Sequence, residues 1–186
     1  MVPPQVFRVA VFGTWRALPG SEIYANAEAV GRGFAELGGV VVTGGYSGVM
    51  EAAARGAKSV MGETAGYTCS RLDAELSVNQ YIDRIVHSET LSERTARLVN
   101  DSDICIVLPG RLGTLAELTV ALEARAKGEK EWPVLLLGPH WMGFFDWMKR
   151  SFSDLSVPGE ADSPEALCRH GESAEELVSI ARSWWG

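Results

Sequence analysis

Four short runs of almost wholly apolar residues recur along the chain, and glycine follows each of them within two residues. The runs read VAVF, VVVT, ICIVL and VLLL, and the glycines are Gly13, Gly44, Gly110 and Gly138. Strands that are apolar at every position are typical of a parallel sheet covered on both faces. Segments with helical spacing separate the runs. The sequence therefore predicts an α/β fold, a doubly wound Rossmann-like parallel sheet with helices on both faces.

Residue patterning places the remaining elements. Strands are expected at residues 6–12, 40–43, 64–68, 103–108 and 133–137, with a short strand or an extended arm at 81–86. Helices are expected at residues 22–37, 49–58, 91–100, 114–127, 141–152 and 173–185. The segment 153–171 is rich in Ser, Pro and Asp, so we expect a loop there. No repeat, low-complexity tract or linker is visible, which predicts that residues 1–186 form a single domain.

The size and charge of the chain narrow its possible partners. A chain of 186 residues has room for one sizeable core, and 46% of its residues are hydrophobic. Its formal net charge of -7 provides no basic field, so we expect no nucleic-acid polymer as a partner. A single nucleotide, or another small phosphate-bearing ligand, needs only a local anion site and stays a candidate.

Cysteine and histidine usage indicates a cytoplasmic protein without a metal. The three cysteines are far apart and odd in number, which suits a reducing compartment better than a disulfide framework. The histidines at 87, 140 and 170 have no metal-ligand spacing, and no cofactor is expected. No signal peptide is visible and no apolar run approaches membrane-spanning length, so we expect no membrane partner.

A glycine turn follows the second apolar run. Gly44 and Gly45 begin it, and Ser47 and Gly48 end it before the next helix. Glycine after a strand lets the backbone approach a ligand closely and tolerates positive φ. The turn matches neither the Walker loop nor GxGxxG. Two interpretations stay open: a ligand-binding surface, and a tight turn that needs glycine for its geometry alone.

The stretch from Cys105 to Glu117, CIVLPGRLGTLAE, joins a strand, a glycine-containing loop and the start of a helix. Free backbone N–H groups at a helix N-terminus form a ready anion site, here near Gly113 and Thr114. Glu117 lies one turn into the helix, which puts a carboxylate beside the expected phosphate. The alternative is a capping box of Thr114 with Glu117, which would make Glu117 purely structural.

Arg94 lies early in the helix expected at residues 91–100, in the stretch Ser-Glu-Arg-Thr. Its planar guanidinium suits a phosphate or a carboxylate. The alternative is an ordinary solvated helix face, which the nearby Arg97 and Asp101 favour.

Together the three segments resemble the LONELY GUY (LOG) family, whose members were often labelled lysine decarboxylase-like. The family pattern PGGxGTxxE corresponds to residues 109–117, which read PGRLGTLAE. The family's helix with an Arg-Lys pair corresponds to Arg94 and Thr95, and its glycine turn corresponds to residues 44–50. The resemblance extends over about residues 6–148, which is most of the chain.

The resemblance implies a dimeric, doubly wound nucleotide-binding domain. Enzymes of this family hydrolyse the N-glycosidic bond of cytokinin riboside 5'-monophosphates, and often of AMP, to the free base and ribose 5-phosphate. Carried over by position, Arg94 and Glu117 would be the catalytic pair. The residues expected to bind substrate or phosphate are Gly44, Gly45, Ser47, Gly48, Gly110, Arg111, Gly113 and Thr114.

Three positions depart from the family pattern. Arg111 replaces the second motif glycine, Thr95 replaces the usual lysine, and Glu123 falls where a threonine often contributes to the site. A bulky cation at position 111 could grip a larger anion or block the familiar one. Relatives on the same fold carry molybdenum cofactor, whose pterin phosphate would use the same anion site. A non-catalytic carrier or sensor, binding molybdenum cofactor or a nucleotide, is therefore the alternative function.

Two further interpretations concern lysine and tryptophan. A pyridoxal-dependent lysine decarboxylase fits poorly, because none of the four lysines lies at a glycine-rich strand end. Trp15 follows a strand end and could reach the ligand crevice. Trp184 and Trp185 are expected to be buried in the fold or at a dimer contact, because exposure would be costly.

Overall fold

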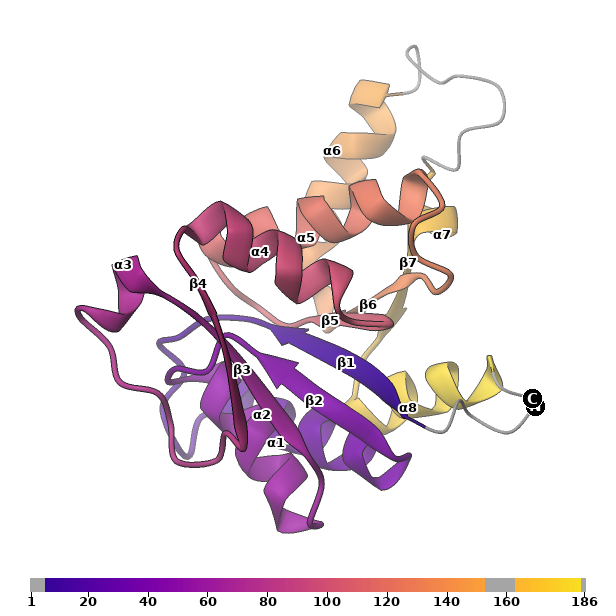
Figure 1. Cartoon of the computed structure of the whole chain (residues 1–186). Coiled ribbons are helices and arrows are strands. Elements are labelled where there is room, and N and C mark those ends of the chain that lie inside the picture. The colour runs from indigo at the N-terminus through magenta and orange to yellow at the C-terminus, as the bar shows by residue number, and fades with distance from the viewer. Residues whose placement is uncertain (1–5, 153–162, 185–186) are drawn as a thin grey trace.

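A seven-stranded parallel sheet forms the centre of the computed structural model, which describes residues 6–152 and 163–184 (Figure 1). The strand order is β4-β3-β2-β1-β5-β6-β7, and each neighbouring pair is parallel. The strands are β1 (Phe7–Phe12), β2 (Gly39–Thr43), β3 (Thr64–Cys69), β4 (Arg84–Ser88), β5 (Ile104–Val107), β6 (Val134–Leu137) and β7 (Cys168–Gly171).

Helices connect the strands and cover both faces of the sheet. They are α1 (Glu22–Glu36), α2 (Val49–Ser59), α3 (Ser70–Asp73), α4 (Leu91–Asn100), α5 (Leu112–Ala126), the 3-10 helix η1 (Pro139–Trp141), α6 (Met142–Phe152), α7 (Pro164–Leu167) and α8 (Ala174–Ser183). Figure 1 shows α1, α2 and α8 on one face and α4, α5 and α6 on the other. This arrangement confirms the doubly wound α/β fold.

Two hydrophobic cores lie on opposite faces of the sheet. In β1, Val9 and Val11 belong to the core under α1, α2 and α8, whereas Ala10 and Phe12 belong to the core under α4, α5 and α6. Successive strand residues point to opposite faces, so a strand buried on both sides must be apolar at every position. This requirement explains the continuous apolar runs of the sequence.

The order of the strands reverses at β1, which lies between β2 and β5. The chain moves from β1 to β4 toward one edge of the sheet and from β5 to β7 toward the other. The loops after β1 and β5 meet at this point, where the Thr14 N–H donates to the Pro109 carbonyl at 3.0 Å. Open α/β sheets bind ligands in the crevice outside such a switch point, so the topology positions the candidate site.

Most predicted elements are confirmed within a few residues, three predictions need correction, and one short helix was missed. The loop expected at 153–171 is wrong over its second half, which contains α7 and β7; residues 153–162 lie outside the described part. The sequence of β7 is CRHG, and an edge strand does not need an apolar run. The strand expected at 81–86 lies at Arg84–Ser88, α3 was not predicted, and α5 begins two residues earlier than expected.

The structure tests the expected burial of Trp184 and the expected absence of membrane-spanning segments only in part. Trp184 is partly buried against the core and stacks on Trp132, with ring centroids 5.1 Å apart. Trp185 lies outside the described residues. Among the helices that the structure describes, none has the length and apolarity needed to cross a membrane.

Candidate functional site

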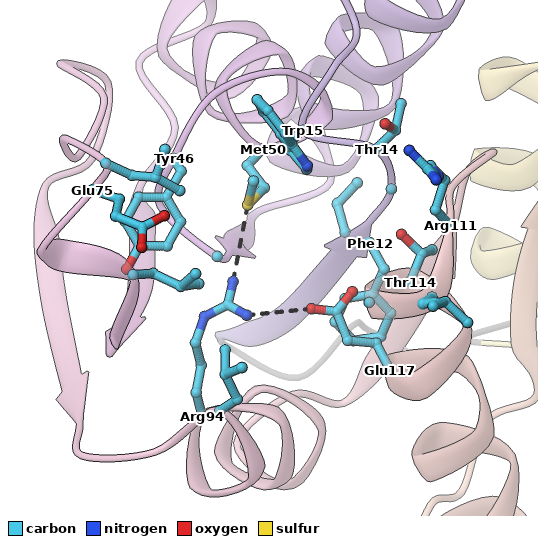
Figure 2. A pocket seen from close by; sticks show the side chains of 18 residues that line it. Phe12, Thr14, Trp15, Tyr46, Met50, Glu75, Arg94, Arg111, Thr114 and Glu117 are labelled. Atoms are coloured by element: carbon cyan, nitrogen blue, oxygen red, sulfur yellow. Dashed lines mark hydrogen bonds and ion pairs between the residues drawn. The ribbon is translucent and has the colours of Figure 1, made fainter. Parts of the chain in front are cut away.

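A cavity of about 480 Å³ opens at the switch point of the sheet (Figure 2). It receives residues from the end of β1 and the loop after it, from the glycine turn after β2 and the start of α2, from the segment around α3, and from the N-terminal parts of α4 and α5. The lining residues are Val11, Phe12, Gly13, Thr14, Trp15, Gly44, Tyr46, Met50, Leu72, Glu75, Leu76, Leu91, Arg94, Arg111, Leu112, Gly113, Thr114 and Glu117.

Arg94 of α4 and Glu117 of α5 lie in contact at the base of the cavity. A guanidinium nitrogen of Arg94 lies 3.6 Å from Oε1 of Glu117, and the two side chains are only 8% and 12% exposed. Nε of Arg94 donates to the Tyr67 carbonyl at 2.6 Å, and another guanidinium nitrogen lies 3.9 Å from Sδ of Met50. Figure 2 shows the pair at the base of the cavity, with the Met50 and Glu117 contacts dashed. The solvated-face alternative for Arg94 is therefore wrong.

Burial raises the pKa of Glu117 from its ordinary value of 4.5 to about 7, and the attraction of Arg94 opposes this rise. A buried carboxylate loses its hydration, so its charged form is disfavoured. Near neutral pH the group is then divided between its neutral and charged forms. Such a carboxyl group suits proton transfer or the stabilisation of a developing positive charge.

The first turn of α5 does not have the capping box that was the alternative interpretation of Thr114 and Glu117. The helix begins at Leu112, its N-cap residue is Arg111, and Arg111 makes no side-chain capping bond. Thr114 is therefore a buried residue inside the first turn, and Glu117 lies beyond that turn with its side chain on Arg94. The capping-box alternative is wrong, because the helix starts before the residue that would cap it. The first-turn N–H groups have no partner within the helix.

The glycine turn shapes the opposite wall of the cavity. A Cβ atom at Gly44 would overlap the guanidinium of Arg94, so the absence of a side chain makes room for that cation. Gly45 and Gly48 have φ of +83° and +70°, conformations that side chains rarely adopt. The Ser47 hydroxyl donates to the Trp15 carbonyl at 3.2 Å and links the two loops.

The predicted site residues thus separate into two groups. Six line the cavity: Gly44, Arg94, Arg111, Gly113, Thr114 and Glu117. The others shape the surrounding backbone without lining it: Gly45, Ser47, Gly48 and Gly110. At Gly110, a Cβ atom would overlap the Thr114 side chain, so glycine lets the loop pack closely against α5. Trp15, considered as a crevice residue, does line the cavity and is 53% exposed.

Tyr46 is the main site residue that no motif indicated. Its hydroxyl donates to Asp73 of α3 at 2.8 Å and accepts from the Cys69 N–H at 3.2 Å. Burial raises its pKa to about 12, so the phenol stays neutral. Its ring centroid lies 5.7 Å from the central carbon of the Arg94 guanidinium. The position of Tyr46 inside the glycine turn is the only feature of the sequence that could have indicated it. Its contact with Arg94 arises only on folding and could not be predicted from the sequence.

Leu72, Glu75, Leu76 and Leu91 complete the wall beside Tyr46 and were also missed. They lie in or near the short α3 and at the start of α4, where the sequence carries no motif. Among residues 6–152 and 163–184, no group of three or more His, Cys, Asp or Glu side chains could hold a metal ion.

Comparison with known proteins places this site in a family. The model of the SLOG cluster4 family matches residues 6–138, a range that includes every candidate site residue. The chain belongs to the SLOG cluster4 family. It is also 31% identical over 150 residues to a Mycobacterium tuberculosis protein named cytokinin riboside 5'-monophosphate phosphoribohydrolase, with 80% of this chain and 79% of that protein covered. The resemblance to the LOG family is thereby confirmed.

Solved structures extend the likeness of this SLOG cluster4 member to nearly its whole length. The molybdenum cofactor binding protein of Rippkaea orientalis has 27% identity and a TM-score of 0.71, with 97% of both chains covered. The molybdenum cofactor carrier protein of Chlamydomonas reinhardtii, at 23% identity and a TM-score of 0.70, covers 95% of this chain and 96% of its own and shows the shared fold.

Proposed function

We propose that this protein is a LOG-like nucleoside 5'-monophosphate phosphoribohydrolase. In this proposal it hydrolyses the N-glycosidic bond of cytokinin riboside monophosphate or AMP to the free base and ribose 5-phosphate. The observation that carries the proposal is the buried Arg94–Glu117 pair in a cavity at the switch point, beside the open N-terminus of α5. The named relative from Mycobacterium tuberculosis supports the same chemistry.

The cavity provides a place for each part of such a substrate. The phosphate binds the N-terminus of α5 at Gly113 and Thr114, where backbone N–H groups and the helix dipole favour an anion. The ribose then lies over Glu117 and Arg94. The base lies toward the apolar wall that Tyr46 and its neighbours form. Holding both ends of the nucleotide fixes its glycosidic bond over the ionisable pair.

Glu117 has the central role in the reaction. As the bond between the base nitrogen and C1' of the ribose breaks, positive charge develops on the sugar, as in glycoside hydrolysis. The Glu117 carboxylate stabilises this charge or takes a proton from the attacking water. The water oxygen bonds to C1', and the proton that the water loses passes to the nitrogen of the departing base. Arg94 holds the carboxylate in place and polarises the leaving base or anchors the phosphate.

Replacing Glu117 by glutamine tests this role. We expect Glu117→Gln to abolish base release from AMP and isopentenyl-AMP, measured by chromatography, while nucleotide binding by calorimetry stays largely intact. Glu123→Gln is the matched control, because Glu123 is an exposed residue of the same helix and does not line the cavity. Equal base release by the wild type and Glu117→Gln would refute the assignment, and no release by the wild type would refute the hydrolase.

A carrier or sensor is the second candidate function, and one observation favours it. The likeness to the molybdenum cofactor binding protein covers 97% of the chain, whereas the family model ends at residue 138. The phosphate of the cofactor's pterin could occupy the N-terminus of α5, and Arg111 adds charge there. Calorimetry with molybdenum cofactor and with AMP separates the two candidates. Tight cofactor binding without base release supports the carrier, whereas base release supports the hydrolase.

The partners and location of the protein remain part of this proposal. We propose a cytoplasmic homodimer that binds a small phosphate-bearing ligand and no nucleic-acid polymer. Light scattering coupled to size-exclusion chromatography measures the assembly directly, and a monomeric mass at micromolar concentration would contradict the dimer.

A further inference from the structure

The wall beside Tyr46 includes a segment of the chain that takes no part in the hydrophobic cores. Residues 70–78, which we call the α3 segment, provide Leu72, Glu75 and Leu76 of the cavity lining. The Leu76 N–H donates to the Leu72 carbonyl at 2.8 Å, so the two leucines lie one helical turn apart on the same face. None of the residues of the α3 segment is buried, so burial in a core does not hold this wall in place.

Asp73 attaches the α3 segment to the rest of the protein. One oxygen of its carboxylate accepts from the Tyr46 hydroxyl at 2.8 Å, and the other lies 3.1 Å from Nδ1 of His87 in β4. Within the part of the chain that the structure describes, no other side chain of residues 71–78 forms a hydrogen bond or an ion pair outside the α3 segment. The position of this wall therefore depends on the two contacts of Asp73.

The simpler interpretation is that Asp73 is an ordinary polar residue of an exposed turn. Tyr46 argues against it, because its side chain is only 1% exposed and a buried hydroxyl needs an acceptor for its proton. The oxygen of that hydroxyl accepts from the Cys69 N–H, and Asp73 accepts its proton. Figure 2 shows Tyr46 beside Glu75 of the α3 segment. The bond to Asp73 thus joins an exposed segment to a buried residue whose ring lies against Arg94.

We propose that Asp73 is a positioning residue for recognition of the base: through Tyr46 it holds the α3 segment against the cavity and fixes the wall that the base contacts. This inference rests on the proposed function, because it takes the base of the nucleotide to lie against this wall. The phosphate and the ribose lie against other elements and do not depend on Asp73. Without its anchor the wall is in place in only a fraction of the molecules, and the affinity for the base falls by that fraction.

Calorimetry in the Glu117→Gln protein, in which the nucleotide is not consumed, tests this role. Asp73→Ala should weaken AMP binding about tenfold, the size of one hydrogen bond to a charged group. Binding of ribose 5-phosphate, which has no base, should stay unchanged. Asp146→Ala is the matched control and should change neither affinity, because Asp146 is an exposed aspartate of α6 that does not line the cavity. Unchanged AMP affinity in Asp73→Ala, or equal losses for the two ligands, would overturn the proposal.

Conservative substitutions show whether Asp73 acts through Tyr46. The side-chain carbonyl of asparagine can still accept from the Tyr46 hydroxyl, so Asp73→Asn should keep most of the AMP affinity. Tyr46→Phe keeps the ring and removes the hydroxyl, so it should weaken AMP binding about as much as Asp73→Ala. Combining Tyr46→Phe with Asp73→Ala should cause little further loss, because both remove the same bond. Fully additive losses would contradict a role that acts through Tyr46.

Kinetics distinguish failure of this role from failure of the proposed reaction. With Glu117 intact, Asp73→Ala should raise KM for AMP about tenfold and change kcat much less, because it removes binding of the base. If the wild type releases base but Asp73→Ala binds AMP normally, the positioning role is wrong and the reaction stands. If the wild type binds AMP without releasing base, and Asp73→Ala weakens AMP alone, the reaction is wrong and the positioning role stands. A wild type that binds no AMP would contradict both.

Discussion

At the scale of single residues, two opposing effects set the charge of Glu117. Burial of the carboxyl group raises its pKa, whereas the neighbouring Arg94 guanidinium lowers it, and burial dominates. Arg94 lies 3.6 Å from this carboxyl group and also donates to the Tyr67 carbonyl, and its attraction offsets only part of the cost of burial. The site therefore holds a carboxylate whose ionisation near neutral pH costs folding free energy.

This cost predicts that Glu117→Gln stabilises the protein at alkaline pH. Well below pH 4.5 the group is neutral in both the folded and the unfolded state, so it has no effect. As the pH rises from 4.5 to about 7, the unfolded state ionises first and the wild type loses stability. The full penalty above pH 7 is on the order of 3 kcal/mol. Urea denaturation at pH 5 and pH 8 measures it.

The variant should therefore exceed the wild type in unfolding free energy at pH 8, with a smaller difference at pH 5. Glu123→Gln, on the exposed face of α5, should show no such pH-dependent gain. A Glu117→Gln protein that is less stable than the wild type at pH 8 would mean that the carboxylate is stabilised in the folded state.

Gly44 leaves room for the guanidinium, and this predicts the effect of Gly44→Ala. The added methyl group would overlap Arg94 and approach Sδ of Met50, both ends of flexible side chains that can move. The fold should therefore survive with a loss of about 1 kcal/mol or less, while base release falls at least about tenfold because Arg94 leaves Glu117. Gly143→Ala in α6, where the methyl group meets nothing within 4 Å, is the control.

Denaturation and steady-state kinetics on both glycine variants measure these effects. Unchanged kcat/KM in Gly44→Ala would show that the position of Arg94 is not critical. Because Arg94 lowers the pKa of Glu117, its displacement should also move the pH dependence of the reaction to higher pH.

At the scale of elements, hydrogen bonds to backbone carbonyl groups join the loop after β1 to the turn after β2. The Val49 N–H donates to the Thr14 carbonyl at 3.0 Å, and the Ser47 hydroxyl donates to the Trp15 carbonyl. Asn79, which precedes β4, donates its side-chain amide to the carbonyls of Gly45 and Tyr46. The cavity wall is therefore a set of mutually bonded loops.

This joining predicts that Gly48→Ala is far more damaging than Gly44→Ala. Gly48 has φ of +70°, and a Cβ atom there would overlap the backbone of Thr14 and Trp15, which cannot move independently. We expect a loss of about 3 kcal/mol of unfolding free energy, the range of strained backbone and overpacking combined. Chemical denaturation checks this, and a loss under about 1 kcal/mol would show that the two loops separate easily.

At the scale of the whole molecule, the C-terminal part contributes to the same core as the strands that lead to the cavity. Leu177 of α8 is fully buried in the core that contains Val9 and Val11 of β1 and the buried residues of α1. β7 adds to the sheet beside β6. A single folding unit is therefore expected, in keeping with the single domain predicted from the sequence.

Leu177→Ala tests this unity. It should lower the unfolding free energy by about 2–5 kcal/mol, as for other large-to-small core substitutions, while keeping one cooperative transition. Ser179→Ala, an exposed change in the same helix, should have little effect. Two transitions, with only one shifted by Leu177→Ala, would show that the C-terminal part folds separately.

The sequence alone determined the elements whose pattern is local. The strands β1, β2, β5 and β6 were predicted from continuous apolar runs followed by glycine, and most helices from the helical spacing of apolar residues. These patterns are visible in the sequence because a strand buried on both faces needs apolar residues at every position and a tight turn after it needs glycine. Neither β7 nor α3 has such a pattern. β7 is an edge strand of sequence CRHG, and α3 is a single helical turn.

The motifs also indicated Arg94, Glu117 and the loop between β5 and α5, but not how they act. Only the tertiary structure brought Arg94 within 3.6 Å of Glu117, started α5 at Leu112 and placed Tyr46 over the guanidinium. These features depend on contacts between distant parts of the chain and on the removal of water from around the pair. Residue types and their spacing predict the secondary structure that a segment forms. The burial of a side chain and the charge that it carries depend on which other segments pack against it in the folded protein.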